Sequence, residues 1–384
     1  MTAAIDPHPA PLTDAPRPPG FWRGLGIIAG LELRQRLRSR TLLVLAIVWF
    51  AIIGAVTVLA WVTLTALYGA VGGDSDGYPL FSLIVYFVLL FGSLVAPAVS
   101  AGSIGAERGQ ATLATTQVTL VGTWSILLGK ALAAWATGIA FLVVASPFVI
   151  FSLVLSRASV VQLVMALLAL AVQIGVFTVI GVGLSALITS QVFAIVVAYL
   201  LVALLSVGSL IAFGLALGAS TRYVEVEYRT LSQEYWNAQA ECGGDAECQA
   251  AVPRECEVFT SPSPVTPAER YWWILALNPY VVVADMVPVD TRSPYGPVDL
   301  FGLISMGVRS LQIPAEPPSG YDECAGASMR YTELRSPEET FDSTVPVWWI
   351  GLSLQVLLTA AALAGGYLRL RTPARTLPKG SRIA

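Results

Sequence analysis

The stretch VVQLVMALLALAVQIGVFTVIGVGLSALI, residues 160–188, contains no Asp, Glu, Lys or Arg. A bilayer core is crossed by roughly 20 apolar residues in an α-helix, and this stretch is longer than that. A helix satisfies all of its backbone hydrogen bonds within the segment, which the lipid interior demands. This stretch therefore decides the fold class, because it predicts an integral membrane protein.

The same pattern recurs along the chain. Charged residues make up only 12% of it, hydrophobic residues 55%, and the mean hydropathy is +0.71, whereas soluble domains carry about 25% charged residues. Lys130 is the one charged residue that falls inside a predicted span, near its end. We therefore predict an all-α integral membrane fold with six transmembrane helices, at residues 41–68, 80–104, 125–154, 160–188, 191–217 and 346–368.

Lys and Arg placement predicts the orientation, because cytoplasmic loops are enriched in these residues. With the N-terminus inside, thirteen of the 22 basic residues lie on the cytoplasmic side. The short loop 69–79 has Asp74 and Asp76 but no basic residue, which suits the outer side. We expect a multi-pass protein of the cell membrane with both termini in the cytoplasm.

The segments outside the spans divide into distinct regions. Residues 1–20 are expected to be a disordered cytoplasmic tail, and 369–384 a second cytoplasmic tail. Apolar residues recur at helical spacing in 21–40, which we interpret as an amphipathic helix along the inner membrane surface. A plain stop-transfer charge cluster is the alternative. The anchoring residues of such a helix would be Arg34, Arg36, Arg38 and Arg40.

Residues 218–345 form a large acidic region between the fifth and sixth spans. It carries 19 Asp and Glu against 8 Arg and no Lys, and we expect it to be extracytoplasmic. Residues 225–241 have a helical pattern, and 253–267 are Pro- and Ser-rich and suggest a loop. The apolar stretch 271–289 is broken at Asn278-Pro279, which favours a short hairpin or a domain core over a seventh span.

All four cysteines lie in this region, which suggests an oxidising compartment and disulfides. Four cysteines allow three pairings, and the sequence does not rank them. Free thiols are the alternative, and the spacings fit no usual zinc pattern. The disulfide candidates are Cys242, Cys248, Cys256 and Cys324.

The only long cytoplasmic connection between spans is ERGQATLATTQVTLVGTWSILLGK, Glu107 to Lys130. It resembles the loop between the second and third spans of the ABC-2 type permease family, which reads ER-x-x-GTL, then TPLSR, then ILLGK. The match is ungapped, with departures at Ala111, Leu120 and Gly122-Thr123. The matching positions are Glu107, Arg108, Thr112, Leu113, Thr119 and 126–130.

This resemblance implies six spans, an amphipathic connecting helix at 21–40, and an apolar break such as Leu277-Asn278-Pro279 before the last span. It also implies that residues 107–121 form a coupling helix seated in a groove of a separate ABC ATPase subunit. Two permease copies, or this chain and a paralogue, would line the pathway. ATPase coupling is then expected from Glu107, Arg108, Thr112 and Thr119.

The chain itself lacks the means to hydrolyse ATP. A P-loop requires Gly-x-x-x-x-Gly-Lys-Ser/Thr, whereas Trp124 and Ala131 stand at the first and last of these positions around Gly129-Lys130. We therefore expect no catalytic, metal or cofactor-binding residue here, with ATP and Mg²⁺ bound by the partner. A net charge of −3 gives no indication of nucleic-acid binding.

Three other functional classes compete with this interpretation. Ion-coupled carriers place ionisable residues in the membrane interior, and these spans have almost none. A membrane hydrolase is disfavoured, because the single histidine, His8, lies in the N-terminal tail. A receptor or regulatory subunit that senses a ligand through the outer region is the main alternative. Gln173 and Gln355 are polar residues within spans, and each is interpreted as forming a helix–helix hydrogen bond rather than lining the path of the apolar or amphipathic substrate.

Overall fold

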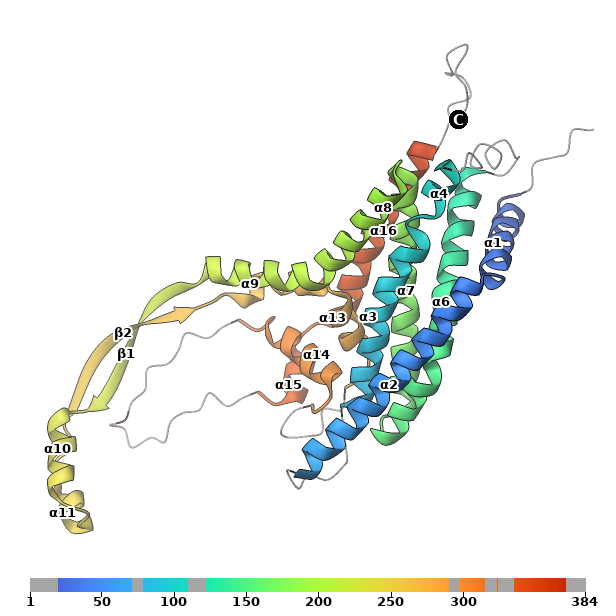
Figure 1. The fold of residues 1–384 in the computed structure, drawn as a ribbon. Helices are drawn as coiled ribbons and strands as arrows, with labels where there is room; N and C mark the ends of the chain where they lie inside the picture. The colour runs from blue at the N-terminus through green and yellow to red at the C-terminus, as the bar shows by residue number, and fades with distance from the viewer. Residues whose placement is uncertain are drawn as a thin grey trace, which may run out of the picture. The chain divides into compact units, whose positions relative to one another are not determined.

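The computed structural model describes residues 20–70, 79–109, 122–289, 297–314, 323 and 335–370 (Figure 1). The chain divides into two compact units, and each is described separately. The first comprises Met1–Ala203 and Ser353–Ala384, and the second is Leu204–Leu352.

The structure confirms six long apolar helices. Their bounds lie within a few residues of those predicted, because runs without charge mark the segments that cross lipid. They are Arg40–Leu67, Leu80–Arg108, Thr123–Leu155, Val160–Leu187, Gln191–Ser220 and Trp348–Leu370. The chain is therefore a multi-pass membrane protein.

In the first unit, α3 and α7 occupy the interior of the helix bundle. Two-thirds of the apolar window of the second span is buried, against 17% for the first span. The helices α2, α3, α6 and α7 run alongside one another (Figure 1). The helices of this unit are α1 (Phe21–Leu37), α2 (Arg40–Ala70), α3 (Leu80–Ser100), α4 (Ser103–Gly109), α6 (Thr123–Leu155), α7 (Val160–Leu187) and α8 (Gln191–Ala203).

Local sequence sets several of these boundaries. Ser159 precedes α7, and its side chain accepts a hydrogen bond from the backbone N–H of Gln162, whose own side chain bonds back in a capping box. The helix α1 begins at Phe21, as the pattern of residues 21–40 predicts. That α1 lies on the membrane surface stays a prediction.

The second unit contains the region between the fifth and sixth spans. It begins with a π-helical turn, η1 (Leu204–Gly208), and α9 (Ser209–Ser220), which complete the fifth span. Its remaining elements are β1 (Arg222–Leu231), α10 (Gln233–Glu241), α11 (Ala246–Ala251), β2 (Cys256–Val265), η2 (Ala268–Arg270), α12 (Trp272–Ala276), α13 (Pro279–Met286), α14 (Leu300–Ser310), α15 (Pro337–Ser343) and the start of α16 (Trp348–Leu370).

The antiparallel pair β1–β2 corrects the sequence-based assignment of this region. Arg222 pairs with Val265 and Leu231 with Cys256, so the helix predicted over 225–241 begins only at Gln233. The segment RYVEVEYRTL alternates β-branched or aromatic residues with charged ones, which is a strand pattern. The helices α10 and α11 connect the strands at the tip of this hairpin (Figure 1).

The tip is closed by a disulfide between Cys242 and Cys248. This bond occurs in only one of the three possible pairings, and it confirms the disulfide prediction for these two cysteines. Cys256 is also disulfide-bonded, and Cys324 lies outside the described residues.

The apolar stretch 271–289 is broken as predicted. Asn278 separates α12 from α13, and its side-chain oxygen accepts a hydrogen bond from the N–H of Tyr280. Pro279 takes the first position of α13, where its missing N–H costs nothing. A small apolar core, which includes Leu275, Val281 and Val308, surrounds these helices within the second unit.

Candidate functional site

The first unit contains a buried cluster of charged side chains at Lys130 on α6. Only 1% of the Lys130 side chain is exposed, and its Nζ donates to Oε1 of Glu107 on α4 at 2.6 Å and to Oε1 of Glu32 on α1. An ammonium group removed from water is stable only when it is paired and hydrogen-bonded. The cluster therefore joins three helices that are far apart in the sequence.

Close helix packing positions this ammonium. Gly129, next to Lys130, lies where α1 crosses α6, and a Cβ there would stand 2.9 Å from Cβ of Ile28 and 3.2 Å from the carbonyl oxygen of Leu25. Any larger residue would push the helices apart. Ser125 adds a hydrogen bond from its Oγ to the carbonyl oxygen of Phe21, at 3.2 Å. The closing ILLGK of the loop sequence is thus, in this structure, the packing surface for α1.

Arg36 extends the cluster along α1. Its Nε lies 3.5 Å from Oε2 of Glu32, one helical turn earlier, and its Nη2 donates to the carbonyl oxygen of Val99 at 3.3 Å. Val99 lies in the last turn of α3, whose carbonyl groups have no partner within the helix. Arg36 therefore links α1 to the end of the second span.

Arg108 performs a similar role at the end of α7. Its Nη2 donates to the carbonyl oxygen of Ala186 at 3.0 Å and its Nη1 to that of Ile188 at 3.3 Å. Ser185 also accepts hydrogen bonds through its Oγ from the N–H groups of Ile104 and Gly105. The short helix α4, which includes the Glu107-Arg108 pair that opens the loop between the second and third spans, is thereby fixed to α7.

The predicted coupling residues thus fall into two groups. Glu107 and Arg108 form contacts within the chain, and their role in ATPase coupling stays a prediction. Thr112 and Thr119 lie outside the described residues, as does most of the coupling helix expected at 107–121.

The predicted anchoring residues also divide. Arg36 is engaged in the cluster, whereas Arg34, Arg38 and Arg40 are exposed and form no ion pair within the described part of the chain. Their positive charge is therefore available to the surroundings of α1.

Gln173 of α7 and Gln355 of α16 each form a helix–helix hydrogen bond, as predicted, and the structure shows that they form it with each other. Nε2 of Gln173 donates to Oε1 of Gln355 at 3.0 Å, and both side chains are fully buried. The pair therefore ties the last span to the bundle.

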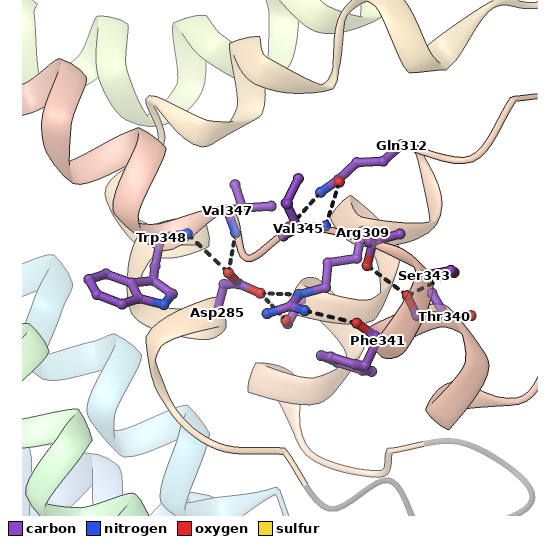
Figure 2. Close-up of polar contacts among 11 residues, drawn as sticks. Asp285, Arg309, Gln312, Thr340, Phe341, Ser343, Val345, Val347 and Trp348 are labelled. Carbon is purple, nitrogen blue, oxygen red and sulfur yellow. Dashed lines mark hydrogen bonds and ion pairs between the residues drawn. The ribbon is translucent and has the colours of Figure 1, made fainter.

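The second unit holds a polar cluster that the sequence did not indicate (Figure 2). Asp285 of α13, whose side chain is 1% exposed, accepts hydrogen bonds from Nε of Arg309 at 2.7 Å and Oγ of Ser305 at 2.6 Å. Its other oxygen accepts from the backbone N–H groups of Val347 and Trp348. Asp285 thus caps the N-terminus of α16 from another helix.

Arg309 completes this cluster. Its guanidinium lies 4.7 Å from the ring centroid of Phe341, in cation–π geometry, and its Nη1 donates to the carbonyl oxygen of Phe341 at 3.5 Å. Charged residues inside the short apolar helices α13 and α14 are the sequence signal that could have indicated it, because buried charges require partners.

Within the described residues, no group of three or more His, Cys, Asp and Glu side chains is arranged to hold a metal ion. Comparison of the chain with models of protein families and with curated proteins found no match. The structural findings define a multi-pass membrane protein with one polar cluster in the helix bundle and another in the unit between the last two spans.

Proposed function

We propose that this chain is the membrane-spanning permease subunit of an ATP-driven exporter of the ABC-2 type. The observation that carries the proposal is the buried cluster of Glu32, Glu107 and Lys130. It joins the helix before the first span, the start of the cytoplasmic loop and the third span. The loop sequence that begins at Glu107 and ends at Lys130 is the stretch that resembles the family.

The cluster suits a mechanical role. A force applied to the loop by a moving partner must pass into the spans without loss in flexible connections. Separating the partners of a buried ion pair costs about 3–5 kcal/mol. The end of the loop therefore moves together with α1 and α6. Because Arg108 holds the same loop end to α7, the motion reaches a second span.

The distribution of charge supports an external energy source. In the six spans, the ionisable Asp, Glu, Lys and Arg side chains lie near the ends, at Arg40, Glu107, Arg108, Lys130 and Arg369. Carriers that move protons or sodium ions use such groups deeper in the membrane. We infer that ATP and Mg²⁺ are bound by a separate ATPase subunit, and that the substrate is apolar or amphipathic.

The experiment that tests the proposal is a mild-detergent pull-down of the tagged chain from its native membrane, with mass spectrometry of the bound proteins. We expect a P-loop ATPase in near-equal amount. A second sample carries Thr112→Arg and Thr119→Arg, which alter the loop sequence and leave the three residues of the ion cluster unchanged, and should lose the ATPase. The matched control is Arg229→Gln on the exposed hairpin, which should retain it.

The alternative is a receptor or regulatory subunit, and the observation that favours it is the separate unit with its disulfide-bonded tip. A preparation without an ATPase, reproduced after chemical cross-linking, would refute the exporter and favour this alternative.

A further inference from the structure

A cavity of about 230 Å³ lies between α1, α2 and α6 in the first unit. Nine of its twelve lining residues are apolar, and the polar ones are Arg36, Ser39 and Thr137. Leu37 and Leu43 on its rim are 73% and 62% exposed, so the cavity opens on the outer surface of the helix bundle. In a membrane protein, this surface faces lipid.

The chemistry of the lining selects hydrocarbon as the occupant. Water stays in a cavity only where it finds two to four polar partners. Thr137 already donates its hydroxyl to the carbonyl oxygen of Ala133 at 2.8 Å, and Arg36 is engaged with Glu32 and Val99. Apart from Ser39, the remaining wall, formed by residues such as Leu42, Ala140 and Val144, offers only apolar contact.

The charge at the mouth selects the head group. Ser39, which lines the cavity, lies between Arg38 and Arg40 in the turn that joins α1 to α2. Both arginines are exposed and form no ion pair within the described residues. Glu32, the acidic residue of α1, is already engaged by Lys130 and Arg36. Basic residues beside a membrane surface attract anionic lipid head groups.

We propose that this cavity binds one acyl chain of an anionic phospholipid, whose phosphate lies at Arg38 and Arg40. The site holds the helix before the first span against the third span by filling the gap between them. The proposal is independent of the exporter function, since it rests on the cavity and the arginines alone.

The test uses the full-length protein in lipid nanodiscs that contain a phosphatidylglycerol with a photoactivatable group in its acyl chain. After irradiation, mass spectrometry locates the labelled peptides. We expect labelling of residues 33–46 and 136–144, and at least a fivefold lower yield at these peptides when the same group is carried by phosphatidylcholine. Equal labelling by the two lipids would overturn the proposal.

Two sets of variants separate the chain site from the head-group site. Ala46→Phe and Ala140→Phe, made singly, fill the cavity and should lower labelling there several-fold, whereas the control Ala360→Phe on the exposed face of α16 should not.

Arg38→Gln with Arg40→Gln should abolish the preference for phosphatidylglycerol, and the control Arg23→Gln should keep it. Wild-type labelling in both cavity-filling variants, each with an unchanged melting temperature, would also overturn the proposal.

Discussion

Lys130 carries the charge on which the cluster in the helix bundle depends. Replacement by Met removes the ammonium and leaves the carboxylates of Glu32 and Glu107 close together without their shared partner. We expect a loss of about 3–5 kcal/mol in the free energy of unfolding, the usual result of removing one member of a buried ion pair. Thermal unfolding in detergent measures it.

The exposed ion pair between Arg229 and Glu227, with side chains 53% and 56% exposed, is the matched control. Arg229→Gln should change stability by no more than about 1 kcal/mol. The double variant Lys130→Met, Glu107→Gln should recover part of the loss, because the remaining carboxylate, Glu32, keeps Arg36 as its partner. An equal loss in the free energy of unfolding for Lys130→Met and Arg229→Gln would show that the buried cluster stabilises the fold no more than an exposed ion pair does.

The hydrogen bond between Gln173 and Gln355 gives a second prediction at this scale. Replacement of either by Leu leaves the other amide buried without this partner, and we expect a loss of about 0.6–1.7 kcal/mol, the range for polar contacts between membrane helices. The double variant should lose less than the sum of the single variants. A double-mutant cycle on thermal unfolding measures the coupling, and strict additivity would argue against the bond.

Asp299, just before α14, gives a prediction of pH dependence. Burial raises the pKa of its carboxyl group, by disfavouring the charged form, and backbone hydrogen bonds from Gly302 and Phe301 lower it by less. The protonated form is therefore favoured by folding. The contribution of Asp299 to the free energy of unfolding is fully present below the ordinary pKa of aspartate. It is lost as the pH rises through the higher pKa of the folded state.

Asp299→Asn should thus raise the melting temperature near pH 7 and leave it unchanged at a pH below 3.8, the ordinary value. Asn is as good an N-cap residue as Asp, so the start of the helix is preserved. The check is a set of melting curves between these two pH values. A variant less stable than the wild type at pH 7 would contradict the sign.

Lys130 also shows how far single-residue inference extends. Its charge inside an apolar run is visible in the sequence, because such a residue requires a partner. Its partners are not, since Glu32 is 98 and Glu107 is 23 residues away. Only the packing of α1 on α6, made close by Gly129, brings them together.

At the scale of elements, the spans were predictable and the hairpin was not. An apolar run without charge must satisfy its backbone hydrogen bonds internally in lipid, and it does so as a helix. This is why the six helices appear where they were expected. The hairpin strands lie outside the apolar runs, and there the alternation in RYVEVEYRTL competed with a weaker helical pattern that continues into α10. Pro262 and Pro264 in β2 suggested a loop, yet Pro is tolerated on an edge strand, and both strands of a two-stranded sheet are edges.

The cap that Asp285 provides for α16 gives a prediction for a whole element. Asp285→Ala removes the acceptor for two backbone N–H groups and leaves Arg309 buried without its carboxylate partner. We expect faster hydrogen exchange at the amides of residues 347–351, with a loss of about 3–5 kcal/mol in the stability of the second unit.

Asp285→Asn is the conservative variant, because one amide oxygen still accepts hydrogen bonds, and it should restore part of the protection. Hydrogen–deuterium exchange with mass spectrometry resolves the segment. Unchanged exchange at the start of α16 in Asp285→Ala would show that the last span does not depend on this cap.

At the scale of the whole molecule, the number of spans constrains where the ends of the chain lie. Six spans place both termini on the same side of the membrane, and the distribution of Lys and Arg predicts the cytoplasmic side. Sites for a sequence-specific protease, added at either terminus or inserted after Ala251, report this topology in sealed right-side-out vesicles. We expect cleavage after Ala251 at once, and cleavage at either terminus only after detergent is added.

Each contrary outcome identifies a different error. Cleavage at both termini with protection after Ala251 would invert the orientation, and would place the disulfide-bonded tip in the reducing compartment that disfavours it. Cleavage at one terminus alone would require an odd number of crossings. The apolar stretch 271–289 would then have to cross as well, although Asn278 and Pro279 divide it into helices of five and eight residues, each far below the length a crossing needs.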